Sequence, residues 1–522
     1  MEENTGDPRR RAILAVMCLS LLIVVIDSTI LNTALPTLAR VLPASTTDLQ
    51  WITDAYSLVF ASMLIVAGGL GDRFGRRRAL MVGLGIFGAG SVAAALSGDA
   101  STLIATRAVM GLGAAFVMPA TLSIINSVFP VRERAGAIGA WSAVAGLGVV
   151  AGPSLGGLLL NHFSWGSVFW VNVPLVAIAL LLAVILVPDL AGNRGTGRLD
   201  ALGAVLSAAG LVVIIDAVIE GTDRGWTSAT TLLEIGAGFV FFAAFVVREL
   251  HAANPLLDVR LFRHRAFTAA TTSIAITMFA LFGSLFALTQ YLQLVVGYSP
   301  LSAGLRALPF AAGVMALAPV SSVLVRSVGA RVIIPLGLTA MSAGLLVLAQ
   351  VDATSGYGVI ALGIAIMGVG MGLILAPAGE SIMSVLPPEQ AGVGSAVNDT
   401  VQELGGALGV AVIGSIVSAS FRQGLDHSHL PKGLIDAARP SIANANAIAA
   451  HAGPTGQRLI EVAHQSFTSA MTSGFTGGAT VAVLGAVLAA IALPKKSVAT
   501  TSTLPAITDM VTAPARPVLV SA

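Results

Sequence analysis

The sequence has 522 residues, of which 56% are hydrophobic and 10% are charged, with a mean hydropathy of +0.89 and a formal net charge of +2. A chain this apolar cannot cover a water-soluble core with its own polar side chains, so soluble globular classes are excluded and lipid is the expected solvent. Basic residues cluster at the ends of apolar runs, as at 9–11, 76–78 and 260–265, which indicates membrane topology and not a nucleic-acid-binding surface.

The first apolar run follows three arginines and superficially resembles a secretion signal. It is longer than the ~7 to 15 apolar residues of such a signal, and no small-residue cleavage site follows it cleanly, so it is interpreted as the first membrane helix. Cys18, the single cysteine, lies inside this run. It cannot form an intramolecular disulfide and is expected to be a small buried hydrophobe.

Apolar segments long enough to cross a membrane recur along the whole chain. A helix needs ~20 predominantly apolar residues to cross the hydrocarbon core. About fourteen such segments are predicted, at 12–37, 50–70, 79–98, 101–123, 135–160, 167–187, 200–219, 228–247, 266–296, 303–325, 332–351, 356–384, 392–420 and 468–493. The chain is therefore predicted to be an all-α integral membrane protein.

Arginine and lysine are distributed asymmetrically between the connecting loops. With the amino terminus in the cytoplasm, alternate loops hold most of these residues, and the opposite loops hold few apart from the long one at 421–466. The positive-inside rule then places both termini in the cytoplasm. The loop at 421–466 is predicted to be an external helical excursion, and the tail at 497–522 is predicted to be disordered.

One sequence element occurs twice. SVFPVRERAG at 127–136 is echoed by SVLPPEQAG at 384–392, and Gly75 with Arg77 is echoed by Gly329 with Arg331. Parallel duplicated halves that enclose a central site are a recurring transporter plan. We therefore predict a six-helix bundle at 1–187, two inserted helices with linkers at 188–265, and a second six-helix bundle at 266–496.

Two opposite charges are predicted to meet inside the membrane. Asp27 lies about two thirds along the first segment, and Arg107 lies at a matching depth in the fourth. A charge at the bilayer centre costs at least ~2.5 to 3.5 kcal/mol, so buried charges usually have a function. Protonation of Asp27 would release Arg107 and shift the balance between two packings. The alternative is a static buried ion pair.

Four further acids lie in or at the ends of predicted spans. Asp54 is near the outer end of the second segment and Glu380 is near the inner end of the twelfth, where an ordinary interfacial position is an equal alternative. Asp399 and Glu403 are four residues apart in the thirteenth, so they share a helical face. Because two carboxylates on one face in low dielectric resist ionising together, these acids are candidates for binding protons or substrate.

A short turn follows the second segment and reads GGLGDRFGRRR at 68–78. Its glycines permit tight backbone geometry, and its arginines can reach headgroups or neighbouring helix ends. Asp72 is placed to face a positive helix end and to hold a cytoplasmic gate shut. The candidate gate residues are Gly68, Asp72, Arg73, Gly75, Arg76 and Arg77.

The fifth segment contains GVVAGPSLGG at 148–157. Its glycines Gly148, Gly152 and Gly156 are four residues apart on one face, so another backbone can approach closely. Pro153 removes a hydrogen bond and bends the helix. With Gly157, these residues form a candidate hinge, whereas ordinary small-residue packing would explain the glycines but not the proline.

These strings together resemble the major facilitator superfamily, in particular its fourteen-helix drug/proton antiporters of the EmrB/QacA type. The matching stretches are IDSTILNTALP at 26–36, GGLGDRFGRR at 68–77, LIATRAVMGLGAA at 103–115, the GxxxGPxxGG pattern at 148–157, NPLLDVRLFRHRAF at 254–267, SPLSAGLRALP at 299–309 and NDTVQELGGALG at 398–409. The resemblance implies a major facilitator fold, proton coupling at Asp27 and Arg107, a gate at Asp72, an antiporter motif around Gly152 and an acidic position at Glu403. One departure is Gly166, where many relatives have arginine.

The function predicted from these features is proton-coupled export of amphipathic drugs, dyes or antibiotics, cationic ones foremost, by a monomeric unit in a bacterial cytoplasmic membrane. Expected partners are small amphipathic substrates, protons and membrane lipids, with no nucleic acid. No cofactor, metal or catalytic residue is expected, because there is no P-loop and His427 with His429 lack further ligands. Two alternatives are a dedicated exporter of one metabolite or antibiotic, and a membrane sensor or scaffold that does not transport.

Overall fold

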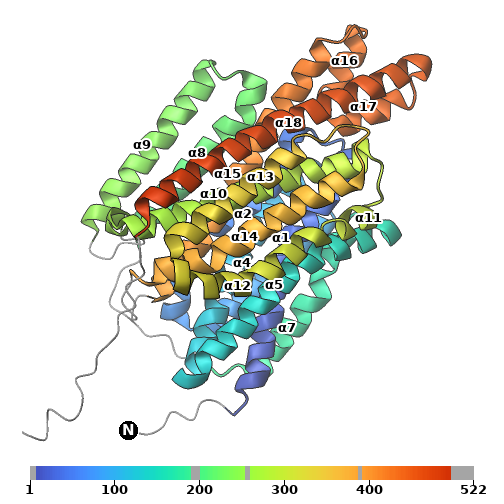
Figure 1. The fold of residues 1–522 in the computed structure, drawn as a ribbon. Coiled ribbons are helices and arrows are strands. Elements are labelled where there is room, and N and C mark those ends of the chain that lie inside the picture. Colours follow the sequence, from blue (N-terminus) through green and yellow to red (C-terminus); the bar gives the residue numbers. More distant parts are fainter. Residues whose placement is uncertain (1–7, 190–199, 253–258, 386–390, 495–522) are drawn as a thin grey trace, which may run out of the picture.

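The computed structural model describes residues 8–189, 200–252, 259–385 and 391–494, which contain helices and no strand. Up to residue 251 the helices are α1 (Arg10–Val41), α2 (Thr46–Phe74), α3 (Arg76–Ala95), α4 (Ala100–Val128), α5 (Val131–His162), α6 (Ser167–Trp170), α7 (Asn172–Leu186), α8 (Ala201–Arg224) and α9 (Ala229–His251). We call the end of the bundle where α1 begins the near end, and the end where α1 finishes the far end (Figure 1).

The rest of the chain is helical in the same way. It comprises η1 (Val259–Arg263), α10 (Arg265–Gln290), η2 (Tyr291–Val295), α11 (Pro300–Leu305), α12 (Leu308–Val328), α13 (Ala330–Leu348), α14 (Tyr357–Met383), α15 (Ala391–Asp426), α16 (Lys432–Ala438), α17 (Ile442–Ala449) and α18 (Gly453–Ala492). Leu493, after α18, packs in one cluster with Phe267, near the start of α10. Both chain ends therefore leave the described bundle at the near end.

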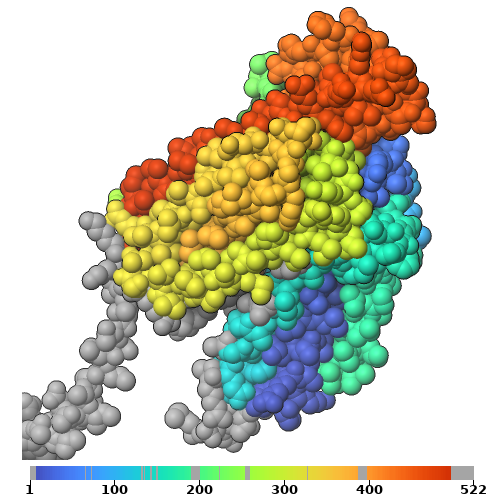
Figure 2. Space-filling view, turned by 45° about the vertical axis from the view of Figure 1, so that its right-hand side comes forward, coloured from blue at the N-terminus to red at the C-terminus, as the bar shows by residue number. Residues whose placement is uncertain are grey.

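Thirteen of the described helices are long and apolar enough to cross a membrane. Helix α2 has 29 residues, so it is also long enough to cross a membrane. It packs against α4 and α15. Each of the fourteen predicted segments overlaps α2 or one of these thirteen spans, three of which combine two of the helices named above. The all-helical membrane fold predicted from the sequence is confirmed. In the space-filling view the blue and cyan residues form one block and the yellow and orange residues another (Figure 2).

The two blocks repeat one turn. Gly75 (φ 105°) joins α2 to α3, and Gly329 (φ 84°) joins α12 to α13, both with backbone angles that favour glycine. Two residues later, Arg77 Nη2 donates to the Val184 carbonyl (2.6 Å) in α7, and Arg331 Nε donates to the Ala490 carbonyl (2.7 Å) in α18. Each arginine therefore ties the turn to the last helix of its own block.

Helices α8 and α9 are the predicted insert. Helix α8 packs against α2 and α15, one helix from each block, and α9 packs on α8 at the edge of the bundle. Few residues of α9 are buried, and its exposed side chains include Leu233 and Phe239. Such an apolar face is typical of a helix that is covered by lipid or by another protein.

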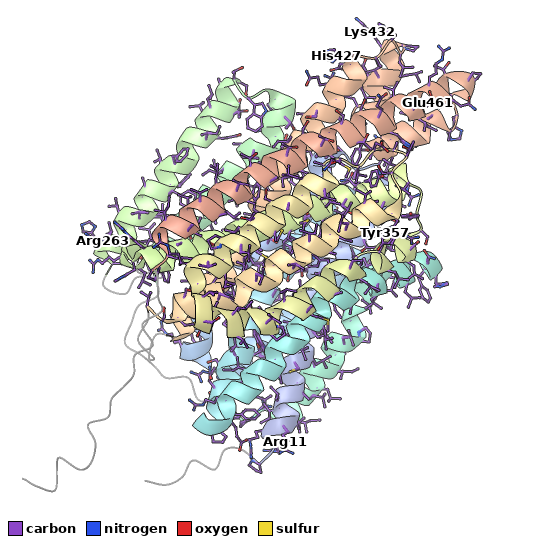
Figure 3. The ribbon with its side chains drawn as sticks, viewed as in Figure 1. Arg11, Arg263, Tyr357, His427, Lys432 and Glu461 are labelled. Atoms are coloured by element: carbon purple, nitrogen blue, oxygen red, sulfur yellow. The ribbon has the colours of Figure 1, made fainter. Side chains whose placement is uncertain are left out.

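Helices α15 to α18 project beyond the bundle at the far end, where Figure 3 labels His427, Lys432 and Glu461, opposite Arg11 and Arg263. The predicted excursion at 421–466 is helical: α15 runs on to Asp426, and α18 starts at Gly453, well before the predicted 468. The early turns of α18 carry polar residues, which is why hydropathy alone placed its start too late. The tail at 497–522 lies outside the described residues.

Hydrogen bonds join the two blocks at the far end. Gln50 Nε2 donates to the Ala411 carbonyl (3.0 Å), and Gln293 Nε2 donates to the Thr33 carbonyl (2.9 Å). The Thr46 amide donates to the Pro440 carbonyl (3.0 Å) between α16 and α17. Because buried side-chain amides are costly to leave unbonded, these links hold the far end closed in this conformation.

Candidate functional site

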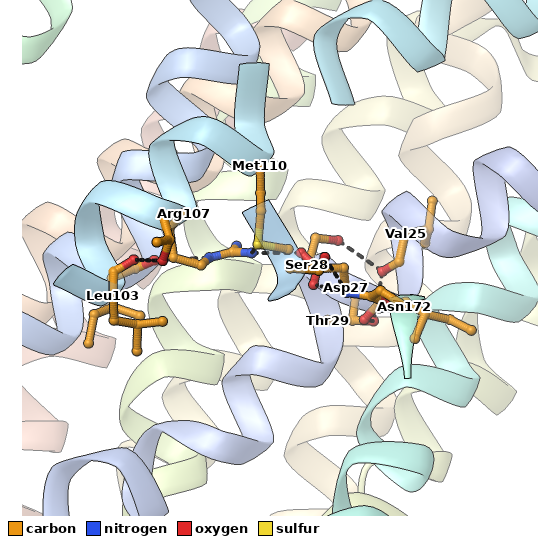
Figure 4. A network of polar contacts seen from close by, with 12 residues as sticks. Val25, Asp27, Ser28, Thr29, Leu103, Arg107, Met110 and Asn172 are labelled. Atoms are coloured by element: carbon orange, nitrogen blue, oxygen red, sulfur yellow. Dashed lines mark hydrogen bonds and ion pairs between the residues drawn. The ribbon is translucent and has the colours of Figure 1, made fainter. Parts of the chain in front are cut away.

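Asp27 and Arg107 form a buried ion pair between α1 and α4 (Figure 4). The Asp27 Oδ2 atom lies 2.6 Å from Arg107 Nη1, and both side chains are almost fully buried. The second carboxylate oxygen, Oδ1, accepts a hydrogen bond from Asn172 Nδ2 (2.8 Å), at the start of α7. With both oxygens accepting, Asp27 has the surroundings of a charged carboxylate.

The guanidinium of Arg107 is held on its other sides as well. Its Cζ atom lies 4.3 Å from the centroid of the Tyr56 ring, and Nε donates to the Ile52 carbonyl (3.3 Å). Both contacts come from α2. A cation in low dielectric is stabilised by a ring face and a carbonyl, so Arg107 ties α1, α2 and α4 together.

A small cavity lies beside this pair, between the two blocks. Its lining includes Ser28, Asp54, Tyr56 and Arg107 from one block, and Phe282, Gln402 and Glu403 from the other. The space inside is close to that of a single water. In this conformation the two blocks are thus linked at the far end, and this cavity has room for about one water.

Asp54 differs from the other acids in its contacts. It is fully buried, and neither of its carboxylate oxygens has a hydrogen-bond partner among the described residues. Glu403 lines the same cavity from α15. Asp54 and Glu403 thus present carboxyl groups to one space from opposite blocks, where a ligand cation or a proton can bind.

The other two candidate acids lie elsewhere. Asp399 accepts a hydrogen bond from Asn398 Nδ2 (3.2 Å) one turn before Glu403 and is absent from the cavity lining. Glu380 is exposed in the last turns of α14, at the near end. The structure therefore brings together Asp27, Arg107, Asp54 and Glu403, and leaves Asp399 and Glu380 outside the group.

The turn between α2 and α3 makes contacts at the near end. Arg76 Nη1 donates to the Ser123 carbonyl (3.1 Å) and to the Ser127 hydroxyl in α4. Arg73 lies against the ring of the adjacent Phe74. Gly68 is close enough to Pro119 of α4 that an added Cβ would be in ordinary contact (3.5 Å). The side chain of Asp72 lies outside the described part of the structure, so its role as a gate remains a prediction.

Three glycines of α5 face α1. A Cβ at Gly148 would lie 2.9 Å from Val25 Cγ1, and one at Gly156 would lie 2.6 Å from Ile30 Cγ1. At Gly152 it would lie 2.9 Å from Thr29 Cβ and overlap the hydroxyl. These distances are shorter than side chains tolerate, so α5 approaches α1 through a glycine face, as the spacing predicts.

Gly157 has a different neighbour. A Cβ there would overlap the backbone of α11, with the Leu301 amide nitrogen and the Pro300 carbonyl oxygen at 2.6 Å. In turn, a Cβ at Gly304 would lie 2.7 Å from the Pro153 carbonyl carbon. The element around Pro153 is thus the place where α11, from the second block, rests on α5, from the first.

Sequence reasoning missed Asn172 and Tyr56. Asn172 stands in the stretch WGSVFWVNVP, where an amide within an apolar run was the available signal. Tyr56 is one of only four tyrosines in the chain. At Gly166, the one departure from the resemblance, a Cβ would lie 2.7 Å from the Ala95 carbonyl oxygen, so a side chain does not fit there in this conformation.

Comparisons with known proteins agree with this architecture. The family model described as Major Facilitator Superfamily matches residues 17–410. The chain belongs to the major facilitator superfamily. It is 36% identical over 419 residues to "Multidrug resistance protein Stp" of Mycobacterium tuberculosis, covering 80% of this chain and 78% of that protein. It is also 36% identical over 466 residues to "Methyl viologen resistance protein SmvA" of Salmonella typhimurium, covering 87% and 92%.

The fold of this superfamily member is also found among solved structures. A bacterial homologue of the human lysosomal transporter Spinster, in an inward-facing and unoccupied conformation, aligns with a TM-score of 0.66 over 92% of this chain and 98% of that one. The sequence identity is 18%, so the similarity concerns the fold. The protein is thus a multi-pass membrane transporter by family.

Proposed function

We propose that this transporter is a proton-coupled exporter of amphipathic organic cations, located in the bacterial cytoplasmic membrane with both termini inside. The proposal depends most on one observation. Asp54 and Glu403 face a shared buried cavity from opposite halves, directly beside the Asp27–Arg107 pair. Acids facing a space between two bundles can attract a cation, and changes in their protonation can be linked to movement of the halves.

Proton coupling is assigned to Asp27 and Arg107. In this conformation the Asp27 carboxylate accepts bonds from Arg107 and Asn172. A proton that binds Asp27 removes the negative charge that pairs with Arg107. The guanidinium then keeps its contact with the Tyr56 ring. The contact between α1 and α4 then weakens, which favours the other arrangement of the halves.

The substrate class follows from the charge of the cavity and from the names of relatives. One relative is called a multidrug resistance protein, and another is named for resistance to methyl viologen, an organic dication. Ring and amide groups from Phe282 and Gln402 stand beside the acids. A cation with an apolar body satisfies both kinds of group, and loose apolar contacts permit several substrates.

The remaining motif residues are assigned to the gates. Arg76 and Arg77 bind α4 and α7 beside the turn at the near end, and we assign Asp72 to the same gate. The glycines of α5 are assigned to the hinge at the far end, where α11 rests on Pro153. Asp399 and Glu380 are retained as acids on the proton or substrate route, outside the cavity.

Glu403→Gln tests the substrate assignment. Resistance of the variant to the dication methyl viologen and to the monocation tetraphenylphosphonium should fall by about tenfold or more. One charge contact in low dielectric stabilises binding by at least ~1.4 kcal/mol. Export of a neutral dye should change much less. Accumulation assays in a host that lacks its own exporters measure both classes.

The matched control for that assay is Glu461→Gln, on the part of α18 that projects from the bundle. It should leave both substrate classes unchanged. Equal losses for cationic and neutral compounds in Glu403→Gln would remove this residue from cation selection. Export of one compound alone from a chemically diverse panel would favour a dedicated exporter, and export of none would favour a sensor or scaffold.

A further inference from the structure

A second polar site lies at the far end, away from the central cavity. Arg306 follows α11, and its guanidinium lies close to two tyrosine rings. The Cζ atom is 3.9 Å from the centroid of Tyr298 and 5.2 Å from the centroid of Tyr357. Tyr357 also donates its hydroxyl hydrogen to the Arg306 carbonyl (3.1 Å). Aromatic rings therefore stabilise the positive charge of the guanidinium, and its N–H groups remain the atoms that can donate hydrogen bonds.

Only some of these N–H groups are used. Nη1 donates to the Ser302 carbonyl (3.1 Å) and to the Ser302 hydroxyl. Nε is buried and has no hydrogen-bond partner, and no carboxylate forms an ion pair with Arg306 among the described residues. Arginine always carries its charge. The site therefore holds a positive group with one unsatisfied donor and no counter-charge from the described part of the chain.

Exposed apolar side chains surround the site. Leu305 and Leu308 flank Arg306 and expose 46% and 44% of their surface. Tyr357 lies toward the far end in Figure 3. Tyrosines gather where membrane headgroups meet the hydrocarbon. Exposed leucines beside an uncompensated arginine suit a ligand with an apolar chain and an anionic head.

We propose that Arg306, beside Tyr298 and Tyr357, binds the phosphodiester group of a membrane phospholipid whose acyl chains lie over Leu305 and Leu308. Guanidinium and phosphate match in charge and in planar donor geometry. A lipid bound here would affect the contact between the two blocks, because α11 ends at Leu305 and contacts Pro153 of α5 through Gly304. A bound phospholipid favours the conformation in which the far end is closed.

The test measures lipid binding to the purified, delipidated full-length protein, with no transport step. Dioleoylphosphatidylglycerol should raise the thermal unfolding midpoint of the wild type. Arg306→Ala and Arg306→Gln should need about fivefold more of this lipid for the same shift, the factor expected from one interfacial arginine. Native mass spectrometry should show one retained phospholipid fewer in both variants. The control Arg458→Ala, an exposed arginine on α18, should match the wild type.

Two further probes identify the source of the phosphate. Dioleoylglycerol has the same chains without phosphate, and glycerol 3-phosphate has the head without chains, so both should act weakly on the wild type. A full effect of glycerol 3-phosphate alone would overturn the lipid assignment in favour of a free phosphate. An unchanged lipid response in both Arg306 variants would overturn the site itself. Because neither readout requires proton-coupled export, failure here is distinguishable from failure of the proposed function.

Discussion

Asp27→Asn should abolish concentrative export while leaving the protein folded. Asparagine keeps the size of Asp27 and one acceptor oxygen for Arg107, but it cannot exchange a proton. One proton that crosses 100 mV supplies ~2.3 kcal/mol, so the variant should lose the roughly fiftyfold concentration ratio that this energy sustains. Steady-state accumulation of a fluorescent cation in energised vesicles measures the ratio.

The control for Asp27→Asn is Asp99→Asn. Asp99 caps α4 by accepting a bond from the Thr102 amide (2.8 Å), and asparagine caps helices about equally well. Hydrogen bonds from Thr102 hold the pKa of Asp99 below its usual value, so in the wild type it is charged at neutral pH and carries no exchanging proton. The control should export normally. If Asp27→Asn exported normally, the role of Asp27 would be limited to the static ion pair with Arg107.

Gly157→Ala should give the second large effect. The new methyl group would overlap the Leu301 backbone, where no side-chain rotation can relieve the contact. Overpacking of this kind costs about 1–3 kcal/mol, so the closed far end should lose stability and the export rate should fall by about tenfold or more. Initial rates of dye efflux and the thermal unfolding midpoint measure both effects.

Gly146→Ala is the matched control on the same helix. A Cβ at Gly146 would have nothing within 4 Å, and alanine favours a helix by up to ~1 kcal/mol over glycine. Its export rate should equal that of the wild type, with equal or higher thermal stability. If both variants behaved alike, the contact between α5 and α11 would have no part in transport.

The positions of the membrane helices could be predicted from the sequence because length and hydropathy alone decide whether a segment can cross a bilayer. The meeting of Asp27 and Arg107 could also be anticipated, since two opposite charges at one depth are stable mainly as a pair. The Gly148, Gly152 and Gly156 face followed from spacing alone.

Other features of the site could be recognised only in the folded structure. Asn172 reaches Asp27 only because α7 is rotated so that its first residue points inward, and spacing along a uniformly apolar helix does not reveal rotation. Asp54 and Glu403 line the cavity, whereas Asp399 and Glu380 do not. This difference depends on which helices meet across the two halves. The Arg306 site joins residues up to 59 positions apart through stacking of rings, for which a linear sequence gives no periodic signal.

Proton movement on addition of substrate tests the central claim most directly. In proteoliposomes that contain a pH-sensitive dye and hold no membrane potential, an outward proton gradient (acidic interior) should drive uptake of tetraphenylphosphonium as protons leave, and a protonophore should stop this uptake. The account predicts that the wild type takes up the cation as protons leave, and that in Asp27→Asn the proton gradient drives no cation uptake. Cation transport that persists at full rate with the protonophore present would contradict the account.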